Sequence, residues 1–186
     1  DPQGSAGDWA DTAGENLPFD VAQDTNPELL AQLRKLDYDI VLVDAPGSLQ
    51  DDSVLRTVVA EADFVILPTE PAALSIRPLL RTVNDLVKPT GTPYRVLLNK
   101  CDGRTPGRTI DAAGLLDSLG LARLRAYVRL YAIHQDGPIT GQVVTQYQPA
   151  GSGQLAIDDF TKVTDELHKI WESKEEEAAA ELKVAH

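Results

Sequence analysis

The chain has 186 residues, 42% of them hydrophobic, and a formal net charge of −12. This composition suits a folded domain with its own core and excludes a chain that is disordered throughout, and no apolar run approaches the roughly 20 residues that cross a bilayer. Its single cysteine, Cys101, cannot form a disulfide within the chain, which favours a reducing compartment, so we predict a cytoplasmic protein.

The charge is unevenly distributed along the chain. Residues 1–76 carry −12, residues 77–133 carry +6 and residues 134–186 carry −6. The net charge argues against binding to nucleic acid, because phosphate binding depends on lysine and arginine. The basic middle leaves two interpretations open, a local cationic patch or arginines that are simply solvated on helix surfaces.

Helical spacing of apolar residues alternates with short, continuous apolar runs. Such runs are typical of strands that are buried on both faces of a parallel sheet. Asn26 is a predicted N-cap for the first helix. In chain order, we predict a helix over 27–36, a strand over 40–44, a helix over 51–62, a strand over 64–70, a helix over 75–87 that Pro89 ends, a strand over 95–100, a helix over 110–119, a strand over 125–130 and a helix from 151 to about 181.

This alternation predicts an α/β fold with a mostly parallel, doubly wound sheet flanked by helices. In such sheets ligands bind beyond the carboxyl ends of the strands. The first three predicted strands all end in polar residues, which predicts a site there. These residues are Asp44, then Thr69 and Glu70, then Asn99, Lys100 and Asp102.

Asp44 allows two interpretations from its local sequence, Asp-Ala-Pro-Gly. A carboxylate at a strand end can orient a water on Mg²⁺ beside a phosphate, or it can cap the turn or the helix that follows. The phosphate-gripping motif G-x-x-x-x-G-K-[ST] is absent, because no glycine of this sequence precedes a lysine.

Five segments in order carry a family resemblance: DPQGS, YDIVLVDAPGSL, ADFVILPTEPAALSI, VLLNKCDGRT and GQVVTQYQPAGSGQLAIDDFTKVTDEL. The chain resembles the ParA family of partition ATPases, the deviant P-loop group that also contains MinD, from residue 1 to about 167. The resemblance implies a P-loop NTPase-like domain over 1–170 that lacks its first β-α-β portion and its phosphate loop. The charged, Ala-rich composition of residues 171–186 predicts a frayed tail. Since the chain has no methionine, we expect a fragment. Since the phosphate loop is missing, we expect it to hydrolyse ATP poorly by itself.

The resemblance also implies site residues for an intact protein that uses ATP and Mg²⁺. Asp1 and Asp44 match the catalytic acids, and Asp44 would support Mg²⁺ through water. Asn99 matches the position that reads adenine, and Asp102 lies in the loop beside the nucleotide. The candidates for non-specific DNA binding are Arg77, Arg81, Arg104, Arg108, Arg123, Arg125 and Arg129.

These features predict the C-terminal portion of an ATPase for plasmid or chromosome partitioning. The resemblance implies an ATP-dependent homodimer that is cytoplasmic and nucleoid-associated, with non-specific DNA and a ParB-like stimulating protein as partners. One alternative is a truncated, non-catalytic module that binds or regulates a partner. Another is a MinD-like positioning ATPase that cycles on a membrane, but the acidic tail lacks the basic face of a membrane-binding helix, so we expect no membrane partner.

Overall fold

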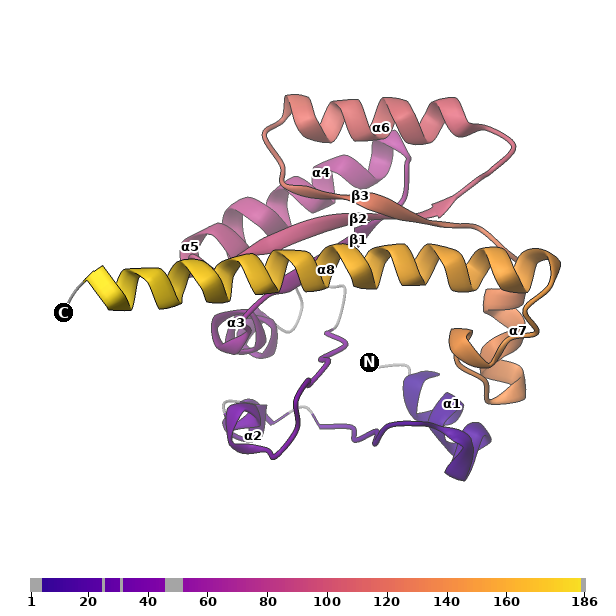
Figure 1. Cartoon of the computed structure of the whole chain (residues 1–186), viewed down its shortest axis with the longest axis horizontal. Coiled ribbons are helices and arrows are strands. Elements are labelled where there is room, and N and C mark those ends of the chain that lie inside the picture. Colours follow the sequence, from indigo (N-terminus) through magenta and orange to yellow (C-terminus); the bar gives the residue numbers. More distant parts are fainter. Residues whose placement is uncertain (1–4, 25, 31, 46–51, 185–186) are drawn as a thin grey trace.

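Three parallel strands form one sheet in the computed structural model, which describes residues 5–24, 26–30, 32–45 and 52–184. The strands are β1 (Val65–Thr69), β2 (Tyr94–Cys101) and β3 (Arg123–Arg129), in that order across the sheet. Helices lie on both faces (Figure 1). The predicted α/β architecture with a parallel sheet is therefore confirmed, and three of the four predicted strands are in place.

Two helices cover one face of the sheet and a long helix crosses the other (Figure 1). The first two are α4 (Ala73–Thr82) and α6 (Pro106–Ser118), and the long one is α8 (Gly151–Val184). The remaining elements are α1 (Ser5–Ala13), η1 (Gly14–Asn16), α2 (Pro27–Leu30), η2 (Leu33–Lys35), α3 (Asp52–Glu61), the π-helical η4 (Val83–Val87), α5 (Lys88–Thr90), α7 (Ile133–Thr140) and η5 (Val144–Gln146).

Side chains of the strands contribute to three apolar clusters, of which two hold the main helices against the sheet. Val96 and Leu98 of β2 pack with buried side chains of α4 and α6, including Leu116. Leu124 and Val128 of β3 pack instead with side chains of α8. Because both faces of the sheet are covered, its strands read as continuous apolar runs in the sequence.

The predicted strand over 40–44 is wrong. The segment is extended but belongs to no strand of the described sheet, and Ile40 and Leu42 are 57% and 84% exposed. A strand needs a neighbour that takes its backbone hydrogen bonds, and β1 is paired only with β2 among the described residues. An apolar run is thus insufficient for a strand when no described strand lies beside it.

Several helix boundaries differ from prediction, among them the start of α6, which begins at Pro106 and not at residue 110. The helix predicted over 27–36 is two short turns, α2 and η2, although Asn26 does cap it by accepting the Glu28 N–H at 3.0 Å. Pro89 lies inside α5, and the helix ends at Gly91, whose φ of 72° suits a residue without Cβ. α8 continues as a helix through Val184, where we expected a frayed tail from residue 171. The division of the chain into 1–170 and 171–186 stays a prediction.

Candidate functional site

Polar side chains meet at the carboxyl ends of β1 and β2, as the sequence predicts. Lys100 Nζ lies 2.8 Å from the Glu70 Oε1 atom, so an ion pair joins the ends of the two strands. Both side chains are more than half exposed, so the pair contributes little to stability. The parallel pairing of β1 with β2 sets the relative positions of the two strand ends, beyond which a ligand of such a sheet binds.

Asn99 is held in place by the backbone of its neighbour. The Lys100 N–H donates to Asn99 Oδ1 at 2.8 Å, and Lys100 has a φ of 53°, a left-handed conformation that few residues other than glycine adopt. The backbone uses the amide oxygen, and no hydrogen bond from the Asn99 amide N–H groups to another described residue is present, so these donors can serve a ligand. This arrangement suits recognition of an acceptor atom on a base.

Asp102 orders the loop after β2 through one residue, Arg104. The Arg104 guanidinium donates from Nη2 to Asp102 Oδ2 at 2.7 Å, and the Arg104 N–H donates to Asp102 Oδ1 at 2.9 Å. The side-chain hydrogen bond from Arg104 is the main reason that the pKa of Asp102 falls to about 2. Asp102 is therefore a carboxylate at neutral pH, and its first structural role is to organise this loop.

The structure describes only one of the two predicted catalytic acids. Asp1 lies outside the described residues. Asp44 is exposed and follows the extended segment that joins no strand. Mg²⁺ is commonly held by one or two carboxylates with water and phosphate, and no group of three metal-binding side chains occurs among the described residues. The described residues therefore fit a contact with the base of a nucleotide but show no assembled Mg²⁺ site.

The seven candidate DNA-binding arginines fall into two groups. Three are engaged by carboxylates: Arg104 by Asp102, Arg123 by Asp117 and Arg129 by Asp159. The other four have exposed side chains with no ion pair among the described residues. They are Arg77 and Arg81 on α4, Arg108 on α6 and Arg125 on β3.

Arg129 is the most tightly held arginine. Its Nη2 atom lies 2.6 Å from Asp159 Oδ1, its Nε atom lies 2.8 Å from Asp159 Oδ2, and the Asp159 side chain is only 4% exposed. The hydrogen bond with Asp159 raises the pKa of Arg129. This pair ties β3 to α8, so Arg129 has a structural role whatever else it contacts.

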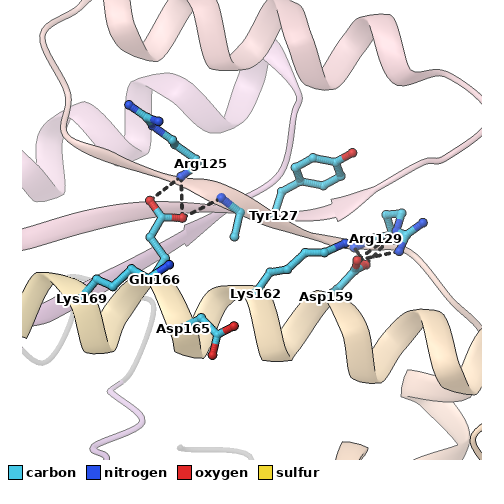
Figure 2. A pocket seen from close by; sticks show the side chains of 9 residues that line it. Arg125, Tyr127, Arg129, Asp159, Lys162, Asp165, Glu166 and Lys169 are labelled. Carbon is cyan, nitrogen blue, oxygen red and sulfur yellow. Dashed lines mark hydrogen bonds and ion pairs between the residues drawn. The ribbon is translucent and has the colours of Figure 1, made fainter.

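A groove of about 680 Å³ runs between β3 and α8 (Figure 2). Sequence reasoning missed the part that α8 plays here. Its residues Asp159, Lys162, Glu166 and Lys169 line the groove, while Val163 and Leu167 pack beneath β3. The sequence did indicate a charged face on this helix, because charged residues recur three or four positions apart beside its apolar positions.

The chain is similar to two known proteins. Maintenance of carboxysome distribution protein A from Gloeobacter kilaueensis is 39% identical over 172 residues, which cover 92% of this chain and 79% of that protein. The MinD cell division protein of Aquifex aeolicus has the same fold, with a TM-score of 0.57 over 84% of this chain and 74% of that one, at 18% identity. No protein-family model matches the chain.

The two similarities carry different weight. At 18% identity the likeness to MinD shows the fold alone, which is the P-loop NTPase fold. The carboxysome distribution protein is a ParA/MinD-type ATPase, and its identity extends over almost all of this chain. The chain therefore belongs to the ParA/MinD family of ATPases.

Proposed function

We propose that this chain is part of a positioning ATPase that binds DNA and distributes a large cargo. The observation that supports this most is the 39% identity to a protein named for carboxysome distribution, over 92% of the chain. We accordingly propose a carboxysome or a similar protein assembly as the cargo. Plasmid or chromosome partitioning, which the sequence motifs suggest, is the alternative that the same family offers.

ATP and Mg²⁺ are the proposed cofactors, because ParA/MinD-type ATPases use both. Asn99 would donate its amide hydrogens to the adenine, and the Asp102–Arg104 turn would shape the loop beside it. Asp44 would orient water on Mg²⁺, and Asp1 would assist the attacking water. The cation would supply positive charge against the phosphates during transfer.

Replacing Asn99 by alanine is expected to weaken ATP binding about three- to tenfold, because one neutral hydrogen bond contributes roughly 0.5–1.5 kcal/mol. Calorimetric titration of ATP with Mg²⁺ into the full-length protein measures this. Asn84→Ala is the matched control, since Asn84 is an exposed asparagine on η4 that bonds only Lys88 Nζ among the described residues. Equal affinities for the wild type and Asn99→Ala would contradict the assignment.

We propose that the ATPase binds DNA without sequence specificity, through arginines on its surface. The exposed arginines Arg77 and Arg81 lie one turn apart on α4, and Arg108 lies in the first turn of α6, which covers the same face of the sheet. A sequence-independent contact needs such cations, and each one that meets a phosphate adds to the salt dependence. Arg104, Arg123, Arg125 and Arg129 stay candidates, although carboxylates already engage three of them.

Reversing the charge at both Arg77 and Arg81 to glutamate is expected to lower DNA affinity at least about tenfold on every sequence, with a shallower dependence on salt. Fluorescence anisotropy with unrelated duplexes at several salt concentrations, with and without ATP, measures both effects. Lys88→Glu on α5, which makes half of that change in net charge, controls for a general effect of charge. If the variant kept the affinity and the salt dependence of the wild type, α4 would not be the DNA-binding surface. If the wild-type protein bound no duplex in the presence of ATP, the proposed function on DNA would be wrong.

The proposed assembly is a homodimer that forms with ATP and separates when a ParB-like partner stimulates hydrolysis. We propose that it resides in the cytoplasm on the nucleoid. None of the helices in the described part of the chain is long and apolar enough to cross a membrane. Fluorescence microscopy of a tagged protein together with a DNA stain tests this location. If the cargo stayed evenly spaced in cells that lack the protein, the positioning role would be wrong.

A further inference from the structure

A histidine lies among aromatic rings where α7, η5 and α8 meet. The ring of His134, on α7, has its centroid 5.8 Å from that of Phe160 on α8. Its centroid is 6.1 Å from that of Tyr131, just before α7, and 6.2 Å from that of Tyr147, just after η5. Tyr147 itself is buried. His134 therefore packs as an aromatic group that joins α7 and the end of η5 to α8.

One ring nitrogen of His134 has no polar surroundings. The Nε2 atom is buried and has no hydrogen-bond partner among the described residues. A neutral imidazole leaves at most one neutral nitrogen unpaired there, whereas an imidazolium would bury a charged N–H donor, which costs much more. Burial accordingly lowers the pKa of His134 from its ordinary value of 6.5. The packed structure thus favours the neutral ring.

The counter-charge that a protonated His134 would need is already paired. The charge of Asp159 raises the pKa of His134, but less than burial lowers it. The Asp159 carboxylate receives Arg129 Nη2 at 2.6 Å and Arg129 Nε at 2.8 Å, so little attraction remains for an imidazolium. The other charged side chains of α7, of α1 with η1, and of the turns of α8 beside Phe160 are Asp136, Asp8, Asp11, Glu15, Asp158 and Lys162.

The elements that His134 holds on α8 also hold the N-terminal helix. α1 packs on α7, where a Cβ at Gly141 would lie 2.6 Å from Ala13 Cα. Gln146 of η5 donates from Nε2 to the backbone oxygen of Asn16, the last residue of η1, at 2.8 Å. Figure 1 shows α1 beside α7 and apart from the sheet. A movement of α7 and η5 away from α8 would therefore take α1 and η1 with it.

We propose that His134 is an acid-sensitive switch: its neutral ring holds α7 and η5 on α8, and its protonation releases them together with α1 and η1. A ring that leaves the aromatic cluster is hydrated, so water stabilises its charged form. The released state then binds the proton more readily than the packed state. Because the pKa is lowered in the packed state, the packing is complete above pH 6.5 and weakens as the pH falls below that value.

Hydrogen exchange of the full-length protein tests this switch, when it is followed by mass spectrometry at about pH 7.5 and about pH 5.5 and corrected for the intrinsic effect of pH. Peptides from α1 and α7 should lose protection at the lower pH, while peptides from β2 should keep theirs. Aspartates do not confound the result, since their ordinary pKa of 3.8 lies well below this range. NMR titration of the His134 ring in the wild type should give a pKa below 6.5.

His134→Phe keeps an aromatic ring in the cluster and removes the titratable group, so α1 and α7 should stay protected at both pH values. His168→Phe is the matched control, because it removes an exposed histidine of α8, and it should respond to pH as the wild type does. A response to pH that His134→Phe shares with the wild type would overturn the switch. So would a His134 pKa at or above 6.5 in the wild type, a result that needs no variant to fold.

The behaviour of β2 separates local release from unfolding of the whole domain. If β2 lost protection at the lower pH to the same extent as α1, the domain would be unfolding as a unit and the switch would be wrong. If α1 and α7 alone lost protection, and only while His134 was present, the switch would be confirmed. Neither result depends on ATP or DNA binding.

Discussion

Replacing Asp159 by alanine is expected to lower the free energy of unfolding by about 3–5 kcal/mol, since this leaves a mostly buried arginine without its counter-charge. Asp159 is 3% exposed, and it receives hydrogen bonds from both the guanidinium and the backbone N–H of Arg129. For a domain of this size the loss corresponds to a melting temperature roughly 6–20 °C lower. Thermal unfolding followed by circular dichroism measures it.

A double-mutant cycle measures the interaction energy between Arg129 and Asp159 apart from their other contacts. Arg129→Met alone should destabilise the protein, because it leaves the Asp159 carboxylate buried and unpaired. Arg129→Met together with Asp159→Leu should recover much of the lost stability, because no buried charge remains. Exposed Arg77→Met serves as the control for losing an arginine elsewhere. An Asp159→Ala protein as stable as the wild type would show that the pair does not tie β3 to α8.

Replacing Gly141 by alanine is expected to lower the free energy of unfolding by about 2–5 kcal/mol. Two costs combine at this position. Gly141 ends α7 with a φ of 67°, which costs other residues roughly 1–2 kcal/mol. A Cβ there would also lie 2.6 Å from Ala13 Cα and 2.8 Å from Ala13 N, so α1 must move, and overpacking typically costs about 1–3 kcal/mol.

Gly120 supplies the matched control for this prediction. Its φ of 66° is nearly the same, but a Cβ at Gly120 would meet nothing within 4 Å. Gly120→Ala should therefore show the backbone cost alone, and the difference between the two variants in chemical denaturation measures the close approach of α1 and α7. Equal losses from both substitutions would mean that α1 does not pack on Gly141 in solution.

Sequence reasoning was most reliable for the strands whose neighbours lie in the described chain. The runs over 64–70, 95–100 and 125–130 became β1, β2 and β3, since each could be paired and covered on both faces. The run over 40–44 is equally apolar and is not a strand. Its backbone finds no partner among the described strands, and local sequence carries no information about that partner.

The sequence predicted only part of the site, namely the part that follows from the parallel arrangement of the strands. Parallel strands bring their carboxyl ends to one edge, so Glu70 and Lys100 meet as the spacing suggests. The pairing of Arg129 with Asp159 joins residues 30 positions apart, and no motif marks it. The groove likewise depends on how α8 crosses β3, which apolar spacing alone does not specify.

The amino-acid sequence by itself determined the class of fold and the polar residues at the ends of β1 and β2, because these follow from local patterns of apolar and polar residues. Its motifs indicated the family by resemblance. Only the tertiary structure decided which charges are free. Asp159 and Glu166 are acids in the sequence, but one neutralises Arg129 and the other caps the edge of β3. The charge that a surface offers to a partner is what remains after the fold has paired its own groups, and that pairing depends on contacts between distant segments.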